Sequence, residues 1–253
     1  MPHLQVYLWV LSALIILSAS VLKGLTGFGF ALIALPVLSL IFPMSVLVPA
    51  MSIFNMFTSL MIVLKLKEKI RWHYFVPMFA ASLLGIPLGI YFLEYINEFT
   101  LKIITGIVVI IFSVKMLGKI NLAKRFKNMP IVFAGFLSGI LNTSISVGGP
   151  PIVIAMTRKG YGKDLFRGAL AWFSMFSALF TTAAYVAKNL VPNESLILAI
   201  GCTPLLLLGS RWGNNWSIKI HPEKFKRVVV IMNIITGIVI VTATLIKGKH
   251  GQP

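Results

Sequence analysis

Residues 24–36 read GLTGFGFALIALP and lie within an apolar run that extends from Leu4 to Phe42. Three glycines, Gly24, Gly27 and Gly29, fall within six residues of this stretch. Each glycine in a helix interior costs about 1 kcal/mol relative to alanine, so three together disfavour a continuous helix. The stretch therefore predicts a helix break, or a close approach of two backbones, inside a segment that is otherwise hydrophobic.

A second stretch of the same kind, SVGGPPIVIA at Ser146–Ala155, lies 119 residues further along the chain, where Gly148 corresponds to Gly29. After each break we expect a new helix, near Phe30 and near Pro150, because proline is favoured in the first turn of a helix. Interrupted hydrophobic segments at corresponding positions in two halves of a chain are typical of the binding sites of membrane transporters. The two breaks are therefore the first candidates for a functional site.

The composition is that of a membrane protein. Hydrophobic residues make up 58% of the 253 residues and charged residues only 11%. Several apolar runs reach the roughly 20 residues needed to cross a bilayer. The first run, Leu4 to Leu22, lacks a basic start and a small-residue cleavage site, so we expect a retained span rather than a signal peptide. The net charge of +17 comes from basic residues in short loops between spans, which argues against nucleic-acid binding.

Three further pairs of similar segments occur in the same order in the two halves. They are FNMFTSL (54–60) with FSMFSAL (173–179), LLGIPLG (83–89) with LLGSRWG (207–213), and ITGIVVI (104–110) with ITGIVIV (235–241). Ordered matches of this kind indicate an internal duplication. We predict an all-α integral membrane protein with two repeats, each a broken helical hairpin followed by three transmembrane helices. The predicted segments are a broken hairpin at 4–42 and spans 44–66, 73–93 and 101–117 in repeat 1 (1–120), and a broken hairpin at 129–157 and spans 165–187, 194–212 and 228–246 in repeat 2 (129–246).

The distribution of charge predicts the orientation. Basic residues cluster after the spans 44–66, 101–117 and 194–212 and after the second broken hairpin, whereas the connection after 73–93 is acidic. The positive-inside rule places the basic connections in the cytoplasm and both termini outside. Corresponding spans then run in opposite directions, so the repeats have inverted topology. The second arm of each broken segment is short for a full crossing, which favours re-entrant hairpins with tips inside the membrane.

The two breaks have the chemistry of an anion site. Backbone that leaves a helix inside a bilayer must be buried in protein or line a cavity. The helix that restarts after each break presents unpaired N–H groups and the positive end of its dipole, and such ends bind anions. The predicted substrate-binding residues at the two breaks and on the spans that follow them are Thr26, Gly27, Phe28, Gly29, Asn55, Asn142, Thr143, Ser144, Ser146, Gly148, Gly149 and Ser174. Arg167 and Arg211, at cytoplasmic span ends, would attract an anion at the inner mouth or extend to the lipid headgroups.

Packing is an alternative explanation for the same residue types. Glycines in membrane helices often let two helices approach closely, and we assign Gly85, Gly89, Gly209 and Gly213 to this role. Serine and threonine in spans often bond to their own helix, and Asn55 could fasten two helices. The symmetry of the two breaks and the polar residues around them favour a substrate role there over packing alone.

Other kinds of chemistry find little support. All six acidic residues lie in loops or at span ends, so no mid-span carboxylate is available as a proton or sodium relay. The four histidines and the single cysteine, Cys202, show no metal-ligand spacing, so we expect no metal site. We expect neither a cofactor nor an enzymatic activity.

Four segments resemble the TauE/SafE family of membrane transporters, also called sulfite exporters. They are GLTGFGFALIALP, SVGGPPIVIA, RGAL (167–170) and LLGSRWG (207–213). The resemblance covers nearly the whole chain and implies two homologous halves with a glycine-rich motif in each. The family's glycine motif carries over to Gly27, Gly29, Gly148 and Gly149, and this chain has Phe30 and Pro150 where a richer glycine run is common.

The resemblance implies export of small sulfur oxyanions or organosulfonates such as sulfite or sulfoacetate. We therefore expect a secondary transporter in the bacterial inner (plasma) membrane, with a small anion and the lipid bilayer as partners and homo-oligomers left open. An anion that leaves an inside-negative cell is driven by roughly 2.3 kcal/mol per charge per 100 mV. The alternatives are a non-transporting membrane partner that assembles or anchors an enzyme, and a transporter of another small anion or an amine.

Overall fold

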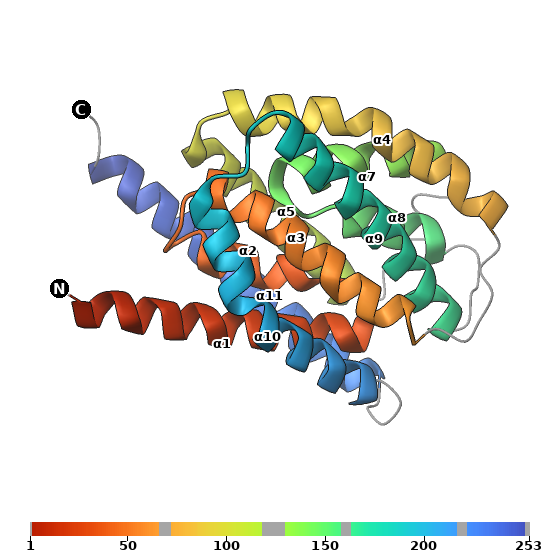
Figure 1. The fold of residues 1–253 in the computed structure, drawn as a ribbon, viewed down its shortest axis with the longest axis horizontal. Helices are drawn as coiled ribbons and strands as arrows, with labels where there is room; N and C mark the ends of the chain where they lie inside the picture. Colours follow the sequence, from red (N-terminus) through yellow and green to blue (C-terminus); the bar gives the residue numbers. More distant parts are fainter. Residues whose placement is uncertain (1, 66–71, 118–129, 158–162, 217–221, 251–253) are drawn as a thin grey trace.

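A computed structural model describes residues 2–65, 72–117, 130–157, 163–216 and 222–250. Within these ranges the chain forms ten α-helices and no β-strand (Figure 1). The helices are α1 (Pro2–Thr26), α2 (Phe30–Leu38), α3 (Met44–Val63), α4 (Trp72–Tyr95), α5 (Glu98–Leu117), α7 (Ile131–Ile145), α8 (Gly149–Thr157), α9 (Lys163–Ala187), α10 (Asn193–Trp216) and α11 (Pro222–His250). The prediction of an all-α protein is confirmed, and each predicted span overlaps one long helix.

The outer surface of the bundle is apolar. Five stretches of the described helices are long and apolar enough to cross a bilayer: Tyr7–Thr26, Met44–Val63, Phe75–Tyr95, Phe166–Ala187 and Asn193–Trp216. Large apolar side chains on several helices are exposed, and they include those of Leu14, Leu84, Ile107 and Ile200. Such a surface is stable against lipid rather than water. The chain is a multi-pass membrane protein.

Glycines bring two pairs of helices into close contact, α4 with α7 and α1 with α10. A methyl group placed on Gly85 would lie 2.4 Å from the Phe136 carbonyl oxygen, and one on Gly213 would lie 2.0 Å from the Val21 carbonyl oxygen. Any side chain at these positions would therefore collide with the backbone of the neighbouring helix. The assignment of the glycines in LLGIPLG and LLGSRWG to helix packing is confirmed.

The other matching segments also pack on each other. A methyl group on Gly106 of α5 would lie 3.0 Å from the carbonyl oxygen of Gly237 in α11, so ITGIVVI and ITGIVIV cross at their shared glycine. The helices of FNMFTSL and FSMFSAL, α3 and α9, pack together as well, and the Ser52 hydroxyl donates to the Ala178 carbonyl oxygen at 3.3 Å. These pairings suit an internal two-fold relation between the halves. The inverted topology and the division into repeats stay predictions.

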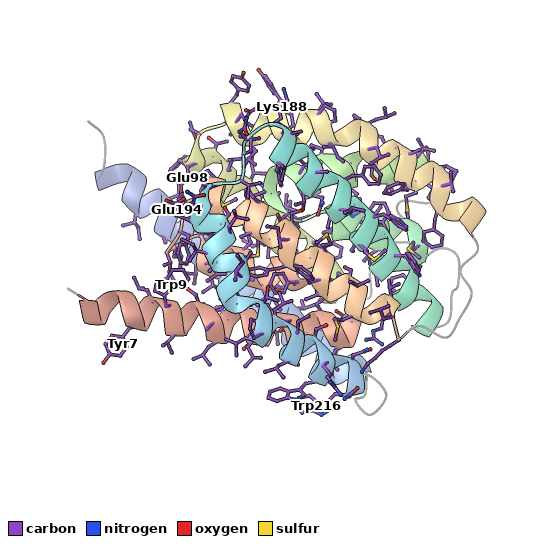
Figure 2. The ribbon with its side chains drawn as sticks, viewed as in Figure 1. Tyr7, Trp9, Glu98, Lys188, Glu194 and Trp216 are labelled. Atoms are coloured by element: carbon purple, nitrogen blue, oxygen red, sulfur yellow. The ribbon has the colours of Figure 1, made fainter. Side chains whose placement is uncertain are left out.

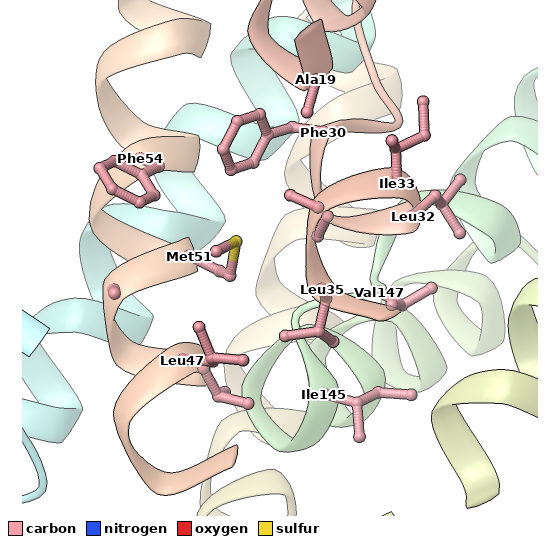
Figure 3. Close-up of a cluster of buried hydrophobic side chains, with 14 of the residues drawn as sticks. Ala19, Phe30, Leu32, Ile33, Leu35, Leu47, Met51, Phe54, Ile145 and Val147 are labelled. Atoms are coloured by element: carbon pink, nitrogen blue, oxygen red, sulfur yellow. The ribbon is translucent and has the colours of Figure 1, made fainter. Parts of the chain in front are cut away.

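The short helix α2 lies in the core of the bundle. Eight of its nine residues are buried, so other helices rather than lipid surround it. Figure 3 shows Phe30 of α2 facing Phe54 of α3, and Leu35 near Val147 of the second break. The Phe30 and Phe54 rings meet edge to face, with centroids 5.7 Å apart. The restart after the first break is therefore held by apolar packing from two sides.

α1 begins and α11 ends on the same side of the bundle, on the left in Figure 1. Figure 2 shows Glu98 and Glu194 on this side, Lys188 at the top of the view and Trp216 at the bottom. The predicted basic connections fall largely on residues outside the described ranges. Which end faces the cytoplasm stays a prediction.

The described acidic side chains lie at helix ends, as predicted. Glu94, Glu98 and Glu194 are exposed, and Glu98 forms an ion pair of 2.6 Å with Lys102. Glu68 and the side chains of Asp164 and Glu223 are outside the described part of the chain.

Candidate functional site

The first break spans residues 27–29 between α1 and α2, as predicted. Gly27 and Gly29 adopt left-handed backbone angles, with φ of 84° and 94°, which side-chain-bearing residues rarely adopt. The amide of Gly27 still donates to the Lys23 carbonyl oxygen at 2.8 Å, while the Thr26 hydroxyl donates to the carbonyl oxygens of Leu22 (2.9 Å) and Phe28. Gly29 caps α2 without a side-chain hydrogen bond, which leaves the first turn of α2 uncapped by side chains.

The second break, residues 146–148, uses a different residue to turn the chain. The prediction placed the turn at Gly148–Pro151, but α7 already ends at Ile145, and the left-handed residue is Ser146, with φ of 53°. The amide of Ser146 donates to Asn142 O (2.9 Å) and that of Val147 to Leu141 O (3.1 Å), a paired arrangement typical of a helix C-terminus. α8 begins at Gly149, one residue before the predicted Pro150.

Gly148 is explained by close packing rather than by its backbone angle. A methyl group there would lie 2.6 Å from Asn142 Cβ and 2.8 Å from the Ser138 carbonyl oxygen. The Ser138 hydroxyl also donates to the Gly148 carbonyl oxygen, which ties the break back to α7. The glycine therefore lets the chain fold back tightly on the helix it has just left.

The two breaks lie next to each other. A methyl group on Gly149 would stand 3.6 Å from Cδ2 of Phe28, an ordinary van der Waals contact. Each break also contacts the long helix of the other half. Gly27 packs on the backbone of Arg167 in α9, and the Ser146 hydroxyl donates to the Val48 carbonyl oxygen of α3 at 3.1 Å. The structure thus brings together the two stretches that the sequence singled out.

Lys23, which the sequence analysis did not include among the site residues, is fully buried one turn before the first break. Its ammonium group donates to Asn55 Oδ1, to the Asn55 carbonyl oxygen at 2.9 Å and to the Ser59 hydroxyl oxygen at 2.7 Å. Asn55, which is half-buried, therefore accepts two hydrogen bonds from this cation. A signal was present, because Lys23 is the only lysine or arginine before Lys65 in a long apolar sequence.

The two predicted arginines have different surroundings. Arg167 is partly buried, and its guanidinium donates to the Gly24 carbonyl oxygen near the end of α1 and to Asn214 Oδ1 of α10. A cation at a helix C-terminus is favourable, because the carbonyl groups there carry partial negative charge. Arg211 is exposed on α10 and does not join the first break.

A network of neutral polar groups adjoins the second break. The Asn142 amide donates to the hydroxyls of Ser177 (3.3 Å) and Thr181 (3.4 Å) on α9, and the Thr143 hydroxyl lies 3.3 Å from that of Thr181. The hydroxyl of the fully buried Tyr185 donates to the Thr143 carbonyl oxygen. These contacts hold the end of α7 against α9 without any charged side chain.

Two of the predicted residues stand apart from these contacts. The Ser144 hydroxyl donates to Ile140 O in its own helix at 2.8 Å, as serine in a span often does. Ser174 is half-buried on α9, two helical turns after Arg167. Among the described residues, no three His, Cys, Asp or Glu side chains are grouped so that they could hold a metal ion.

A comparison with protein families gives one match over most of the chain. The family model described as "Sulfite exporter TauE/SafE" matches residues 12–240. This range includes both breaks and at least part of every described helix. No curated protein and no solved structure matches the chain.

Proposed function

The chain belongs to the TauE/SafE family of sulfite exporters, and from this premise we propose that it exports small sulfur-containing anions, such as sulfite, sulfoacetate or related organosulfonates. The family is one of membrane transporters, and the multi-pass helical fold agrees with that role. The proposed location is the bacterial plasma membrane, with the basic connections in the cytoplasm and both termini outside.

The proposed site lies where the two breaks meet, and the contact between Phe28 and Gly149 is the observation that carries it. The first turn of α2 supplies backbone N–H donors at the positive end of a helix dipole. The remaining proposed substrate-binding residues are Thr26, Gly27, Gly29, Asn55, Asn142, Thr143, Ser144, Ser146, Gly148 and Ser174. Arg167, partly buried beside the first break, and Arg211, exposed on α10, are the proposed attractors of anions at the inner mouth.

The charge near the proposed site favours anions over cations. Lys23 and Arg167 both lie at the first break, and the described acidic side chains are exposed at helix ends. A negative substrate would be driven outwards by the membrane potential, by about 2.3 kcal/mol per charge per 100 mV. Efflux of radiolabelled sulfite from proteoliposomes should therefore rise when an inside-negative potential is imposed. An efflux rate that does not change with the imposed potential would contradict potential-driven export.

A thermal-shift screen tests the substrate class directly. Purified protein in detergent is melted with sulfite, sulfoacetate, taurine or sulfate, because a ligand that binds only the folded state raises the melting temperature. We expect sulfite or sulfoacetate to stabilise the protein and Asn142→Ala to lose part of this shift. A protein that no anion stabilises and that carries no anion in proteoliposomes would instead support the role of a non-transporting membrane partner.

A further inference from the structure

We infer that Lys23 is the charged group that recognises the substrate anion, and that the structure holds it in a resting position on α3. This inference rests on the proposed function and assigns the anion's charge partner within the proposed site. Lys23 lies one turn before Gly27, so it belongs to the same end of α1 as the break.

The first observation is where the charge lies. Lys23 is within the apolar stretch Tyr7–Thr26 and is the only fully buried lysine or arginine side chain among those the structure describes. A charged side chain inside a membrane is costly, and such residues mark substrate or ion pathways by default. A lysine kept here at that cost calls for a function beyond packing.

The second observation concerns the groups that surround the positive charge of Lys23. The three oxygen atoms around the ammonium group belong to Asn55 and Ser59 and are all uncharged. The described carboxylates are exposed at helix ends, as noted above. The positive charge is therefore solvated by neutral groups but not compensated within the described part of the chain, and a bound anion would supply the missing charge.

The third observation is that the ammonium group is saturated. It has three N–H bonds and three acceptors, and all three acceptors lie on α3. An anion can bind Lys23 only by displacing one of them. An oxyanion adds charge–charge attraction to its hydrogen bond with the ammonium group, which the uncharged acceptors lack, so an oxyanion can compete for the ammonium group. Anion binding would thereby loosen the link between α1 and α3.

The matching position in the second half argues against a purely structural lysine. By the offset of 119 residues, Asn142 of α7 corresponds to Lys23 of α1. Asn142 fastens α7 to α9 through neutral hydrogen bonds to Ser177 and Thr181. A link between corresponding helices therefore needs no charge, so the charge at Lys23 requires another explanation.

The test is sulfite transport by proteoliposomes that contain the full chain. Lys23→Met keeps the length of the side chain and removes its charge, and we expect KM for sulfite to rise about 30-fold or more, as for loss of one partner of a buried charge pair. Lys23→Arg keeps the charge and should lie between wild type and Lys23→Met. Lys188→Met removes an exposed charge at the far end of α9 and should leave KM within about twofold of wild type.

A second variant keeps the inference testable if Lys23→Met does not fold. Asn55→Leu removes one of the resting acceptors, so we expect sulfite to bind more tightly, with KM lower by about tenfold or more, as for loss of one competing hydrogen bond from a charged donor. A KM that stays unchanged or rises would contradict the proposal that Asn55 holds Lys23 in a resting position. A rise would also show that Asn55 itself binds the anion.

The outcomes separate the inference from the proposed function. If wild type transports sulfite and a folded Lys23→Met, with a wild-type melting temperature, has an unchanged KM, the inference is wrong and the proposed function stands. If wild type carries neither sulfite nor sulfoacetate, the proposed function itself is wrong.

Discussion

The first break turns the chain through two glycines with positive φ, Gly27 and Gly29, whereas the second turns through a serine, Ser146. Both breaks end a helix with a left-handed residue and restart it within three residues. Glycine adopts this conformation at no steric cost, while another residue is strained by roughly 1–2 kcal/mol. At the second break the Ser146 hydroxyl offsets the strain with a hydrogen bond to Val48 O. The two breaks thus turn the chain with different residues, and Gly148, which corresponds to Gly29, does not adopt a positive φ.

The chemistry of the two breaks differs as well. The first carries Lys23 and Arg167, and the matching positions of the other half, at an offset of 119 residues, are Asn142 and Val48. α8 also begins Gly-Pro-Pro, so its first turn lacks two N–H donors that α2 has. At these matched positions the side chains are therefore positively charged at the first break and neutral at the second. An anion that meets both breaks would be held by charge at one and by neutral contacts at the other.

The largest effect is expected from a methyl group at Gly27. Gly27→Ala combines left-handed strain with a Cβ that would lie 2.9 Å from the Arg167 carbonyl oxygen, and we expect a loss of about 3 kcal/mol of unfolding free energy. Gly29→Ala is the matched control, because it shares the strain but its methyl group would lie 4.0 Å from the nearest side-chain atom, Leu32 Cδ1, and it should lose only about 1–2 kcal/mol. Thermal melting in detergent measures both. Equal losses would show that the contact with Arg167 does not matter.

Arg167→Met should have the next largest effect. It removes the hydrogen bonds to Gly24 O and Asn214 Oδ1, and bonds from a charged donor contribute about 1.5–3 kcal/mol, so we expect a loss of about 2 kcal/mol. Arg211→Met serves as control, because this exposed arginine should change stability by less than about 0.5 kcal/mol. The melting temperature in detergent distinguishes the two. Similar shifts for both variants would contradict a fastening role for Arg167 at the end of α1.

At the second break, Ser146 allows strain and hydrogen bonding to be separated. Ser146→Ala keeps the left-handed strain and loses the bond to Val48 O, so we expect about 1 kcal/mol of destabilisation. Ser146→Gly loses the same bond but relieves the strain, so its stability should stay close to wild type. The comparison is made by melting curves of the two variants side by side. A glycine variant as unstable as the alanine variant would mean that the left-handed angle carries no strain here.

The smallest effect is expected at the contact between the breaks. Gly149→Ala places a methyl group 3.6 Å from the Phe28 ring, an ordinary contact distance, so stability should change by less than about 0.5 kcal/mol. The melting temperature should then move by no more than roughly 2 °C. A large loss would indicate that the two breaks approach more closely than the structure has them.

Much of the framework could be predicted from the sequence. The helices, the two breaks and the packing role of Gly85, Gly89, Gly209 and Gly213 follow from apolar runs and glycine spacing, which act through local propensity and helix contact. The residue that turns the second break could not be predicted in this way. Glycine is the residue that usually adopts the left-handed conformation. Ser146 adopts it while its hydroxyl donates to Val48 O, an acceptor that lies 98 residues earlier in the chain.

The hydrogen-bond partners of Lys23 could not be predicted from the sequence. The sequence placed it at the break, but nothing local indicated that Asn55 and Ser59 would enclose it, because α1 and α3 meet only in the folded bundle. Asn55 was predicted as a substrate ligand, which stays a prediction, and the structure shows it bonded to Lys23. A polar residue in a span reveals its role only through its partner.

The sequence by itself determined that this chain lies in a membrane, that it is helical, and where two of its helices must stop, because hydrophobic length and backbone freedom are local properties. The tertiary structure alone decided that the two breaks are in contact at Phe28 and Gly149, and that Lys23 and Arg167 both lie at the first break. These contacts join segments more than a hundred residues apart or on separate helices. They depend on how the helices pack, which no single stretch of the chain encodes.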